Sequence, residues 1–506
     1  MPDAQARRSL LIAMPQGLGV NGVVSWGLRL AGAMARRGWN VAVAAHGEPP
    51  GHARVDHGMA PGVALVDLRH LPPIDAPGVP LGPVVAAYRD ALEGLDWSAS
   101  NPAIVLPSLE ANCYAAFAAL AATHADHLRV IGWQHSDNAF DPQLLQAYEP
   151  MLSDIACVSD HITTKLRDRL PWRSGDIHNV PYGVELGAPP EPRNPGPLRL
   201  IYPGRMEHEA RRVGVLCTLA HILHERSVEH ELLLVGDGPA AEEVDRRLAG
   251  LPNAHRQQGL SRERLRPLLA SRDVLLLTSR YEGLNVAMLE AMASGVAPVV
   301  TRVDSGTPEA IDHGVTGLLI DAGYHEDEAS IAERMADALQ SLASDSDHLD
   351  RMRQAAYKRA RNRYTIDVHG QTCERLFEHA IAAPPRWWPL DRPCTFTSSS
   401  GSVPGGSVPP DAAERAANAI AGIDGPIAIY GAGRHTLAIA GVLASANVVC
   451  VIDDDPKHHG RSMWGWPVVG VEKPPKNTAV LISSYMHSRS MADRCRDSGL
   501  RPIELY

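Results

Sequence analysis

Short apolar runs alternate with helix-like segments along most of this chain, and the alternation starts twice. The first series begins at Leu10 and ends near Pro190, and the second begins near Leu198. Runs such as "NVAVAA" and "DVLLLTS" are nearly unbroken in apolar content, which indicates strands buried on both faces of a parallel sheet. Parallel strands are joined by crossover helices. The sequence therefore predicts two α/β domains of similar size with a cleft between them.

A change in composition separates a third unit from these two domains. The stretch "CTFTSSSGSVPGGSVPPD" (394–411) is rich in Ser, Gly and Pro, which indicates a flexible linker. A chain of 506 residues is long enough for two or three domains that each bury a core. The predicted segments are 1–190 and 191–383 for the two α/β domains, 384–411 for the linker, and 412–506 for a small third α/β unit.

Charge and composition exclude several classes of partner. The formal net charge of −10 provides no basic field for a polyanion, so nucleic acid is not an expected partner. The apolar run after Arg7 and Arg8 is too short for a signal peptide, and no stretch approaches the roughly 20 apolar residues of a membrane span. Seven scattered cysteines without a Cys-x-x-Cys pair favour a reducing compartment and argue against a thiolate zinc site. We therefore expect a cytoplasmic protein.

Two glutamates mark the most informative stretch, "SRYEGLNVAMLEAMASGVAPVV" (279–300). It reads as the end of a buried strand, a turn at Gly283, a mostly buried helix from about Asn285, and another strand. In such sheets ligands bind outside the carboxyl ends of the strands, which is where Glu282 lies. Glu290 follows inside the helix, so one site could touch two separate parts of a long ligand.

Arginines follow an earlier strand in "LIYPGRMEHEARRVGVL" (200–216). The strand ends at Gly204, Arg205 comes next, and Arg211 and Arg212 open the following helix. Arginine can form paired hydrogen bonds to a diphosphate and neutralise charge on a leaving group. Cations at a helix start oppose the helix dipole, which favours a bound anion over a solvated basic face.

Five ordered motifs resemble those of the family-4 retaining glycosyltransferases of the GT-B fold (glycosyl transferases group 1). The resemblance spans about residues 10–380 and is strongest from 200 to 320. It implies two Rossmann-like domains that face a cleft, and retaining, metal-independent transfer from a nucleotide-diphosphate sugar to the hydroxyl of a glycan, lipid-linked or small-molecule acceptor. No further cofactor is implied. The motifs are "CVSDHITTKL…HNVPYGVE", "GRMEHEARRVGVL", "LLLVGDGP", "RYEGLNVAMLEAMASGVAPVVT" and "SGTPEAIDHGVTGLLI".

The resemblance assigns roles to the charged residues. Glu282, the first residue of an E-x7-E motif, would contact the donor sugar. Glu290 would accept hydrogen bonds from the ribose, and a carboxylate can indeed accept two hydroxyl protons from a vicinal diol. Arg205 matches a phosphate-binding arginine. Arg211 stands where the family usually has lysine, a departure that replaces a point charge by a planar fork and could change donor affinity.

Backbone amides would complete the donor site. Beside Gly204 and Gly283, the amides of Leu284, Asn285 and Val286 at the helix start would face the phosphates.

The first domain contributes a glycine loop and a histidine to the implied site. The loop "GLGVNG" replaces the glycine pair common in the family, and amides at Gly17, Gly19 and Val20 would approach the donor phosphate or the acceptor. His135 follows a strand and falls where the family has an active-site histidine that faces the donor sugar; a structural histidine is the alternative. Weaker candidates are Asp137 and Glu110.

The third unit contains a separate nucleotide-like pattern in "PIAIYGAGRHTLAIAGVLASANVVCVIDDDP". Gly431 and Gly433 follow a strand, Thr436 replaces a third glycine, and Asp453 stands at the spacing of a ribose-binding acid. The unit is similar to small Rossmann-like domains at the front of sugar acyltransferases. It would be a second nucleotide site or an interaction module with a vestigial loop.

A bilayer contact and three other functions stay open at this point. "TTKLRDRLPWR" (163–173) combines basic residues with Leu166, Leu170 and Trp172, so it could rest on the inner face of an anionic membrane, or it is a solvated surface helix. The alternatives to a glycosyltransferase are a sugar-nucleotide epimerase, an NAD(P)-type oxidoreductase that works through the third unit, and a non-catalytic nucleotide-sugar-binding protein.

Overall fold

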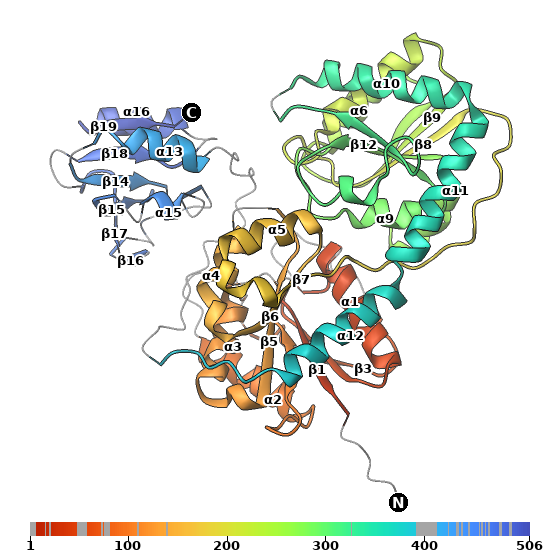
Figure 1. The fold of residues 1–506 in the computed structure, drawn as a ribbon. Coiled ribbons are helices and arrows are strands. Elements are labelled where there is room, and N and C mark those ends of the chain that lie inside the picture. Colours follow the sequence, from red (N-terminus) through yellow and green to blue (C-terminus); the bar gives the residue numbers. More distant parts are fainter. Residues whose placement is uncertain are drawn as a thin grey trace, which may run out of the picture.

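The described part of the chain folds into three α/β units, each built on its own sheet (Figure 1). We call them the first, second and third unit in chain order. In the computed structural model the described residues are 7–15, 17–19, 22–47, 58–71, 74, 81–108, 111–137, 140–324, 326–390, 412–423, 425–431, 435–436, 439–443, 446–454, 456, 459–460, 462–463, 466–474, 478–484 and 488–505.

The first unit has a seven-stranded sheet in the order β3-β2-β1-β4-β5-β6-β7, and all of its neighbouring strands pair in parallel. Strands β1, β4, β5 and β6 are buried along their whole length; the nearly continuous apolar runs of β1 and β4 predict this, whereas β5 and β6 also bury the polar residues Arg129, Gln134, Ser153 and Asp154. Its strands are β1 (Ser9–Met14), β2 (Asn40–Ala45), β3 (Val63–Asp67), β4 (Ala103–Leu106), β5 (Leu128–Gln134), β6 (Leu152–Cys157) and β7 (Ile177–Asn179). Its helices before β7 are α1 (Gly22–Arg36), α2 (Leu81–Glu93), α3 (Ala111–His124), η1 (Ala125–His127), α4 (Phe140–Tyr148), η2 (Glu149–Met151), α5 (Asp160–Arg169) and η3 (Pro171–Asp176).

The second unit repeats this architecture with a six-stranded parallel sheet in the order β10-β9-β8-β11-β12-β13. Its strands are β8 (Leu198–Pro203), β9 (His230–Val235), β10 (Ala254–Gln257), β11 (Val274–Leu277), β12 (Ala297–Arg302) and β13 (Leu318–Asp321). Its helices are α6 (Val213–Glu225), α7 (Ala241–Leu248), α8 (Arg262–Ala270), α9 (Val286–Met292), η4 (Pro308–Ala310), α10 (Glu328–Ser344) and α11 (Ser346–Arg363).

Helix α12 (Ile366–Ala382) returns to the first unit, which corrects the predicted boundary at residue 383. It packs against α1 and strands β4 to β6 (Figure 1). Arg129 Nε on β5 donates to Ala380 O at 3.0 Å, and Trp39 Nε1 donates to Glu374 Oε1 at 3.2 Å. A helical pattern in a sequence shows that one face is apolar, but not which sheet will cover that face.

The two segments that cross between the first and second units are hydrogen-bonded to each other. Val184 N donates to Tyr364 O at 2.7 Å on the way out and Ile366 N donates to Val184 O at 3.1 Å on the way back. The second unit is thus inserted between two parts of the first, and its chain leaves and re-enters at one place.

The third unit has the sheet order β16-β17-β15-β14-β18-β19, in which only the β16–β17 pair is antiparallel among the described pairs. Residues 391–411 of the predicted linker lie outside the described residues. None of the described helices has the length and apolar content to span a bilayer. The elements are α13 (Ala412–Ile420), β14 (Ile427–Tyr430), α15 (Ala440–Leu443), β15 (Val448–Ile452), β16 (Ser462–Met463), β17 (Trp466–Val469), β18 (Ala479–Ile482), α16 (Ser488–Asp497) and β19 (Arg501–Glu504).

Two of the three apolar residues predicted to rest on a bilayer are buried in the protein. Leu166 on α5 and Leu170 just after it are buried in the core of the first unit, and Arg173 is buried as well. Only Trp172 of the apolar residues in this stripe is exposed, at 64% of its surface. The amphipathic pattern therefore faces the protein core, which is the commoner reason for such a pattern.

Candidate active site

A cavity of about 500 Å³ opens between the first and second units, at the carboxyl ends of the central strands. The first unit contributes the residues after β1, the start of α1 and the residue after β5. The second unit contributes the residues after β8 and β11, so both parallel sheets direct their loops into one space, as the general rule for such sheets expects. Among the lining residues are Met14, Gly22, His135, Arg205, Arg211 and Glu282.

Glu282 is held firmly in the wall of this cavity. It lies in the turn after β11 and is 8% exposed. Its Oε1 atom accepts hydrogen bonds from Ser279 Oγ at 2.8 Å and from Asn285 Nδ2 at 2.9 Å. Asn285 also caps α9, since its Oδ1 accepts from Met288 N at 2.9 Å. The capping residue predicted from sequence thus also orients the candidate catalytic carboxylate.

The arginines of the predicted phosphate site have three different environments. Arg211 forms an ion pair with Glu282 and donates to Ser279 Oγ. Arg205 lines the cavity with 61% of its side chain exposed and lies 3.5 Å from the Glu207 carboxylate. Both are placed to meet an anion in the cavity.

Arg212, in contrast, points into the protein. Its guanidinium donates to the carbonyl oxygens of Thr278, Ser279 and Gly323, and it holds the loop after β11 in place. Burial, together with the neighbouring Arg280, lowers the pKa of Arg212 to about 10. Two adjacent arginines in the sequence therefore divide into one cavity residue and one structural residue.

His135 lies at the base of the cavity as a neutral imidazole. Its Nδ1 is 2.6 Å from Tyr182 Oη, and its ring packs against Trp26 at 4.5 Å between centroids. Burial, with a contribution from His369, lowers its pKa to about 3. Its buried Nε2 has no hydrogen-bond partner within the described structure.

Residues from distant parts of the chain support His135, and sequence reasoning missed them. Trp26 Nε1 donates to His369 Nε2 at 3.1 Å, and His369 Nδ1 is 2.7 Å from Pro181 O. His369 belongs to α12. The returning helix therefore holds Trp26, which in turn packs against His135 in the cavity lining. Tyr182 lies inside the motif "HNVPYGV", which offered a signal, whereas nothing in the sequence around His369 indicates that it contacts Trp26.

Glu290, the second glutamate of the motif, makes an ion pair across the two units. It lies on α9, and its partner is Arg29 of α1, which is 7% exposed and also donates to Gly183 O at 3.4 Å. Glu290 is not among the residues that line the cavity. A ribose that binds this carboxylate must share it with Arg29 or replace Arg29.

The predicted amide donors are only partly available. Gly204, Leu284, Asn285 and Val286 all line the cavity, but Asn285 N donates to Thr307 Oγ1 at 3.3 Å, and Gly204 N donates to Val235 O at 2.9 Å. The contact of the amides of Leu284, Asn285 and Val286 with phosphate stays a prediction, and that of Asn285 would have to replace its hydrogen bond to Thr307.

The glycine loop of the first unit begins with a turn, and the ligand contacts predicted for its amides stay a prediction. Gly17 has φ of 69° and its amide donates to Met14 O at 3.2 Å, so it closes a turn. Neither Gly17 nor Gly19 lines the cavity, whereas Gly22 at the start of α1 does. Asp137 accepts from Lys165 Nζ at 2.8 Å and is not a lining residue. Val20, Glu110 and Gly433 lie outside the described residues.

Gly283 allows the two units to touch beside the cavity. A Cβ atom at this position would lie 2.1 Å from His135 O, which no real structure tolerates. The same is true nearby, where a Cβ on Gly306 would lie 2.2 Å from Ser159 Cβ. The closed arrangement of the two units thus depends on the absence of side chains at these positions.

Replacing Gly283 by alanine is expected to force the loops around His135 and Glu282 apart. The new Cβ atom would clash with His135 O, which belongs to the backbone and cannot rotate away. We expect a weakening of ligand binding in the cavity by about tenfold or more, since overpacking typically costs about 1–3 kcal/mol. Small-angle scattering should show a larger radius of gyration than that of the wild type. Gly82→Ala on α2, where a Cβ meets nothing within 4 Å, is the matched control. Unchanged ligand affinity in Gly283→Ala would contradict the importance of this contact.

The third unit brings its predicted nucleotide residues to one edge of the sheet. Gly431 follows β14 with φ of 110°, and Asp453 follows the neighbouring parallel strand β15. Thr436 Oγ1 hydrogen-bonds to Gly431 O and lies 2.5 Å from Ser483 Oγ. A nucleotide site at Gly431 and Asp453 stays a prediction.

Comparison with known proteins assigns the second unit. Residues 197–345, which include Arg205, Arg211, Glu282 and Glu290, match the family described as glycosyl transferases group 1. This segment resembles a glycosyltransferase group 1 domain. Over 174 residues the chain is 33% identical to N-acetyl-alpha-D-glucosaminyl L-malate synthase of Bacillus anthracis, which covers 34% of this chain and 43% of that protein. It is 31% identical over 142 residues to the GDP-mannose-dependent alpha-(1-6)-phosphatidylinositol dimannoside mannosyltransferase of Mycobacterium tuberculosis, covering 25% and 36%. The chain thus matches less than half the length of these relatives.

Comparison with a solved structure extends the similarity from the second unit to the first unit. Sucrose-phosphate synthase from Thermosynechococcus elongatus superposes with a TM-score of 0.58 at 18% identity, over 75% of this chain and 100% of that chain. The predicted GT-B fold, in which two Rossmann-like units face a cleft, is confirmed.

Proposed function

We propose that this protein is a retaining glycosyltransferase that moves a sugar from a nucleotide-diphosphate sugar to an acceptor hydroxyl. The observation that carries the proposal is the single cavity in which His135 from one unit meets Glu282, Arg205 and Arg211 of the group 1 domain. Relatives of this domain include a protein named as a putative glycosyltransferase and a mannosyltransferase named as dependent on GDP-mannose. The acceptor is a glycan, a lipid-linked sugar or a small molecule.

The charges around the cavity suit each part of such a donor. Arg205, with its exposed guanidinium, meets the diphosphate, and Arg211 turns from Glu282 toward the same oxygens. The Glu282 carboxylate then accepts hydrogen bonds from the sugar. Glu290 accepts the ribose hydroxyls in place of Arg29.

Transfer follows from stabilisation of the leaving group. The bond between the anomeric carbon and the diphosphate oxygen breaks, and Arg205 and Arg211 stabilise the charge that develops on that oxygen. The acceptor hydroxyl attacks the oxocarbenium-like carbon from the same face, and its proton passes to the leaving phosphate. No metal or other cofactor takes part in this proposal. His135 acts as a neutral hydrogen-bonding group, since its pKa of about 3 removes it from proton transfer near neutral pH.

Replacing Glu290 by alanine tests the donor site. Loss of hydrogen bonds from a charged group costs about 1.5–3 kcal/mol each, so the donor should bind at least about tenfold more weakly. A thermal-shift panel of UDP-, GDP- and ADP-sugars compares each variant with its own ligand-free melting temperature, which removes the effect of an unpaired Arg29. Glu229→Ala, an exposed position of the second unit, is the control.

Product analysis with the best donor then tests the reaction. An α-linked product from an α-linked donor supports retention, and a β-linked product contradicts it. Binding without turnover would favour the non-catalytic reading, and an equal response of Glu290→Ala and wild type would overturn the donor site. Epimerised donor in the absence of acceptor, or a cofactor reduced at the third unit, would point to the other two alternatives.

A further inference from the structure

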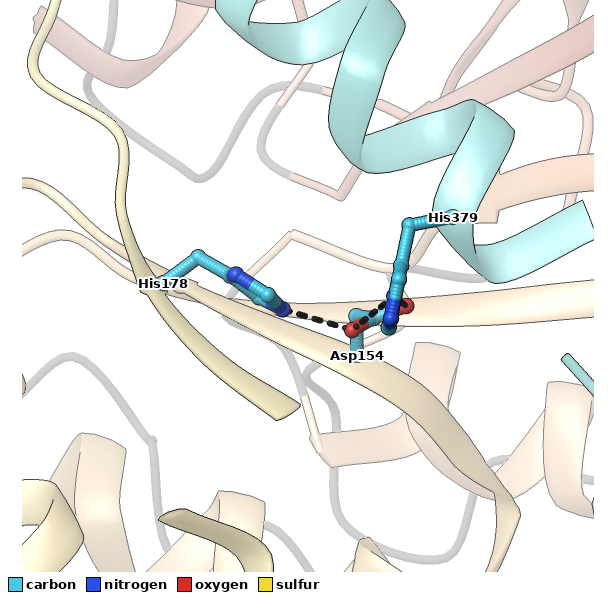
Figure 2. A group of neighbouring side chains, drawn as sticks. All are labelled: Asp154, His178 and His379. Carbon is cyan, nitrogen blue, oxygen red and sulfur yellow. Dashed lines mark hydrogen bonds and ion pairs between the residues drawn. The ribbon is translucent and has the colours of Figure 1, made fainter. Parts of the chain in front are cut away.

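A second polar cluster joins three elements of the first unit and lies outside the cavity lining. Asp154 of β6 lies between His178 of β7 and His379 of α12 (Figure 2). His178 Nε2 is 2.7 Å from Asp154 Oδ1, and His379 Nδ1 is 3.0 and 3.2 Å from the two carboxylate oxygens. The three candidate ligand atoms all lie within 4.8 Å of one another.

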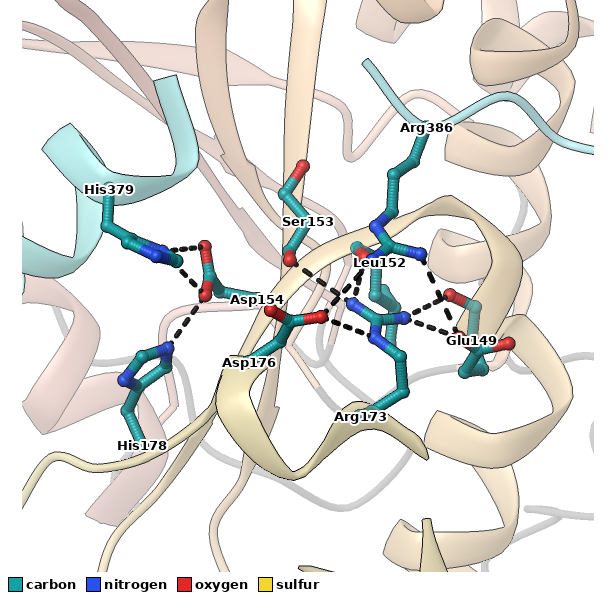
Figure 3. Close-up of polar contacts among 9 residues, drawn as sticks. All are labelled: Glu149, Leu152, Ser153, Asp154, Arg173, Asp176, His178, His379 and Arg386. Carbon is teal, nitrogen blue, oxygen red and sulfur yellow. Dashed lines mark hydrogen bonds and ion pairs between the residues drawn. The ribbon is translucent and has the colours of Figure 1, made fainter. Parts of the chain in front are cut away.

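The Asp154 carboxylate is buried without an arginine or lysine partner among the described residues. Its relative exposure is 0%, and the two imidazoles are its hydrogen-bond partners within the described structure. Arg173 is close by, but it pairs with Glu149 and Asp176 (Figure 3). A buried carboxylate is stable only when a cation or a full set of hydrogen bonds compensates it.

The neighbouring arginine instead fixes the strand that carries Asp154. Arg173 Nη2 donates to Leu152 O at 2.6 Å and to Ser153 O at 3.2 Å, both immediately before Asp154 (Figure 3). Arg386 adds an ion pair to Asp176 at 3.1 Å. The carboxylate therefore has a rigid backbone support, as a preorganised ligand requires.

We propose that Asp154, His178 and His379 bind one divalent transition-metal ion, with zinc as the best fit. Two imidazoles and one carboxylate form a ligand set that zinc accepts, whereas magnesium and calcium prefer oxygen ligands. Bonds of about 2.0 Å in a tetrahedral site place ligand atoms roughly 3.3 Å apart. The two histidine nitrogens lie 2.7 and 3.0 Å from the Asp154 carboxylate, and all three ligand atoms lie within 4.8 Å of one another, so side-chain adjustments can bring them to this spacing. Side-chain exposures of 31% for His178 and 53% for His379 leave room for a water as fourth ligand.

Binding changes which ring nitrogens carry protons. His178 Nε2 and His379 Nδ1 supply their lone pairs to the metal, so each neutral imidazole keeps its proton on the other nitrogen. The two positive charges of the metal ion then replace the ring protons of His178 Nε2 and His379 Nδ1, which face Asp154 in the metal-free protein. The ion would tie α12 to β6 and β7, and thereby fasten the returning part of the chain to the first sheet.

The test compares full-length wild type with His379→Gln and His178→Gln, all purified without a histidine tag and stripped with a chelator. After dialysis against zinc at micromolar concentration, we expect the wild type to retain about one zinc ion more per chain than either variant, measured by elemental analysis. Zinc should raise the melting temperature of the wild type in proportion to the logarithm of its concentration and leave both variants unchanged. His255→Gln, on the exposed side of β10, should behave as wild type.

Several outcomes would overturn the metal site. Equal zinc content in wild type and both variants would do so, and so would stabilisation by magnesium as large as that by zinc. If the cluster instead holds a protonated imidazole, acidification will stabilise the chelated wild type relative to His379→Gln and zinc will have no effect. If a variant does not fold, the wild type is titrated with Co²⁺ and its visible absorption spectrum is recorded. Ligand-field bands that saturate at one equivalent of Co²⁺ would support the site, and the absence of such bands would refute it.

Discussion

Exchanging Glu282 for glutamine is expected to lower kcat by about 100- to 1000-fold, the range for losing one preorganised electrostatic group in an active site. The substitution keeps the size of the side chain and an oxygen acceptor for Ser279 and Asn285, so the turn after β11 should retain its fold. It removes the charge that would receive the sugar hydroxyls and that pairs with Arg211. Release of nucleoside diphosphate, measured with the donor identified by thermal shift, gives kcat.

The direction of a change in donor affinity separates two roles of Glu282. Without its carboxylate partner, Arg211 is free to meet the diphosphate, so KM should fall or stay constant while kcat falls. A large rise in KM with unchanged kcat would make Glu282 a binding residue only. Activity within twofold of wild type would contradict its placement at the reacting sugar. Glu229→Gln supplies the control for a charge change on the same unit.

Acidification from pH 7 to pH 5 is expected to destabilise the first unit strongly. Burial lowers the pKa of His46 to about 4, of His135 to about 3 and of His369 to about 4. In the unfolded chain these groups titrate near 6.5, so below that pH unfolding takes up protons that the folded state refuses. Each group then lowers the free energy of unfolding by up to about 1.4 kcal/mol per pH unit, until the pH reaches its folded pKa.

Tryptophan fluorescence follows this loss mainly in the first unit, because seven of the nine tryptophans lie at positions 26–172 and 387–388, residues 191–365 contain none, and only Trp464 and Trp466 belong to the third unit. Urea titrations at pH 7, 6 and 5 should give a free energy of unfolding that decreases more steeply at each step, with up to three protons taken up per chain near pH 5. His46→Gln should remove about one of these protons, whereas the exposed His255→Gln should remove none. A free energy that is constant between pH 7 and pH 5 would show that these histidines take up protons equally in the folded and unfolded states, which contradicts their lowered pKa values.

The sheets could be predicted because their physical signal is local. A parallel strand that is buried on both faces usually has a continuous apolar run, and β1, β4 and β11 each show one. The destination of α12 could not be predicted, since its apolar face would suit either neighbouring sheet. Only the contacts with Trp26, Trp39 and Arg129 decide that it covers the first.

The candidate site shows the same division between local and distant information. Glu282, Arg205, Arg211 and His135 follow strands, so their approach to one cavity could be inferred from strand order. The pairing of Glu290 with Arg29 depends on how the two units meet, and it has no trace in the sequence near either residue. The turn at Gly17 likewise depends on one backbone hydrogen bond that competes with the predicted ligand contact.

The hydrogen-bonded crossing at Val184, Tyr364 and Ile366 makes the second unit separable. A domain whose two ends lie side by side can be excised as one continuous piece, and the remaining ends can be rejoined by a short loop. A fragment of about residues 191–364 should therefore fold when it is expressed alone. Truncation of the chain after residue 364 would instead remove α12, which covers the sheet of the first unit. For the same reason, any opening of the cleft would have to bend both crossing segments together, because they are hydrogen-bonded to each other.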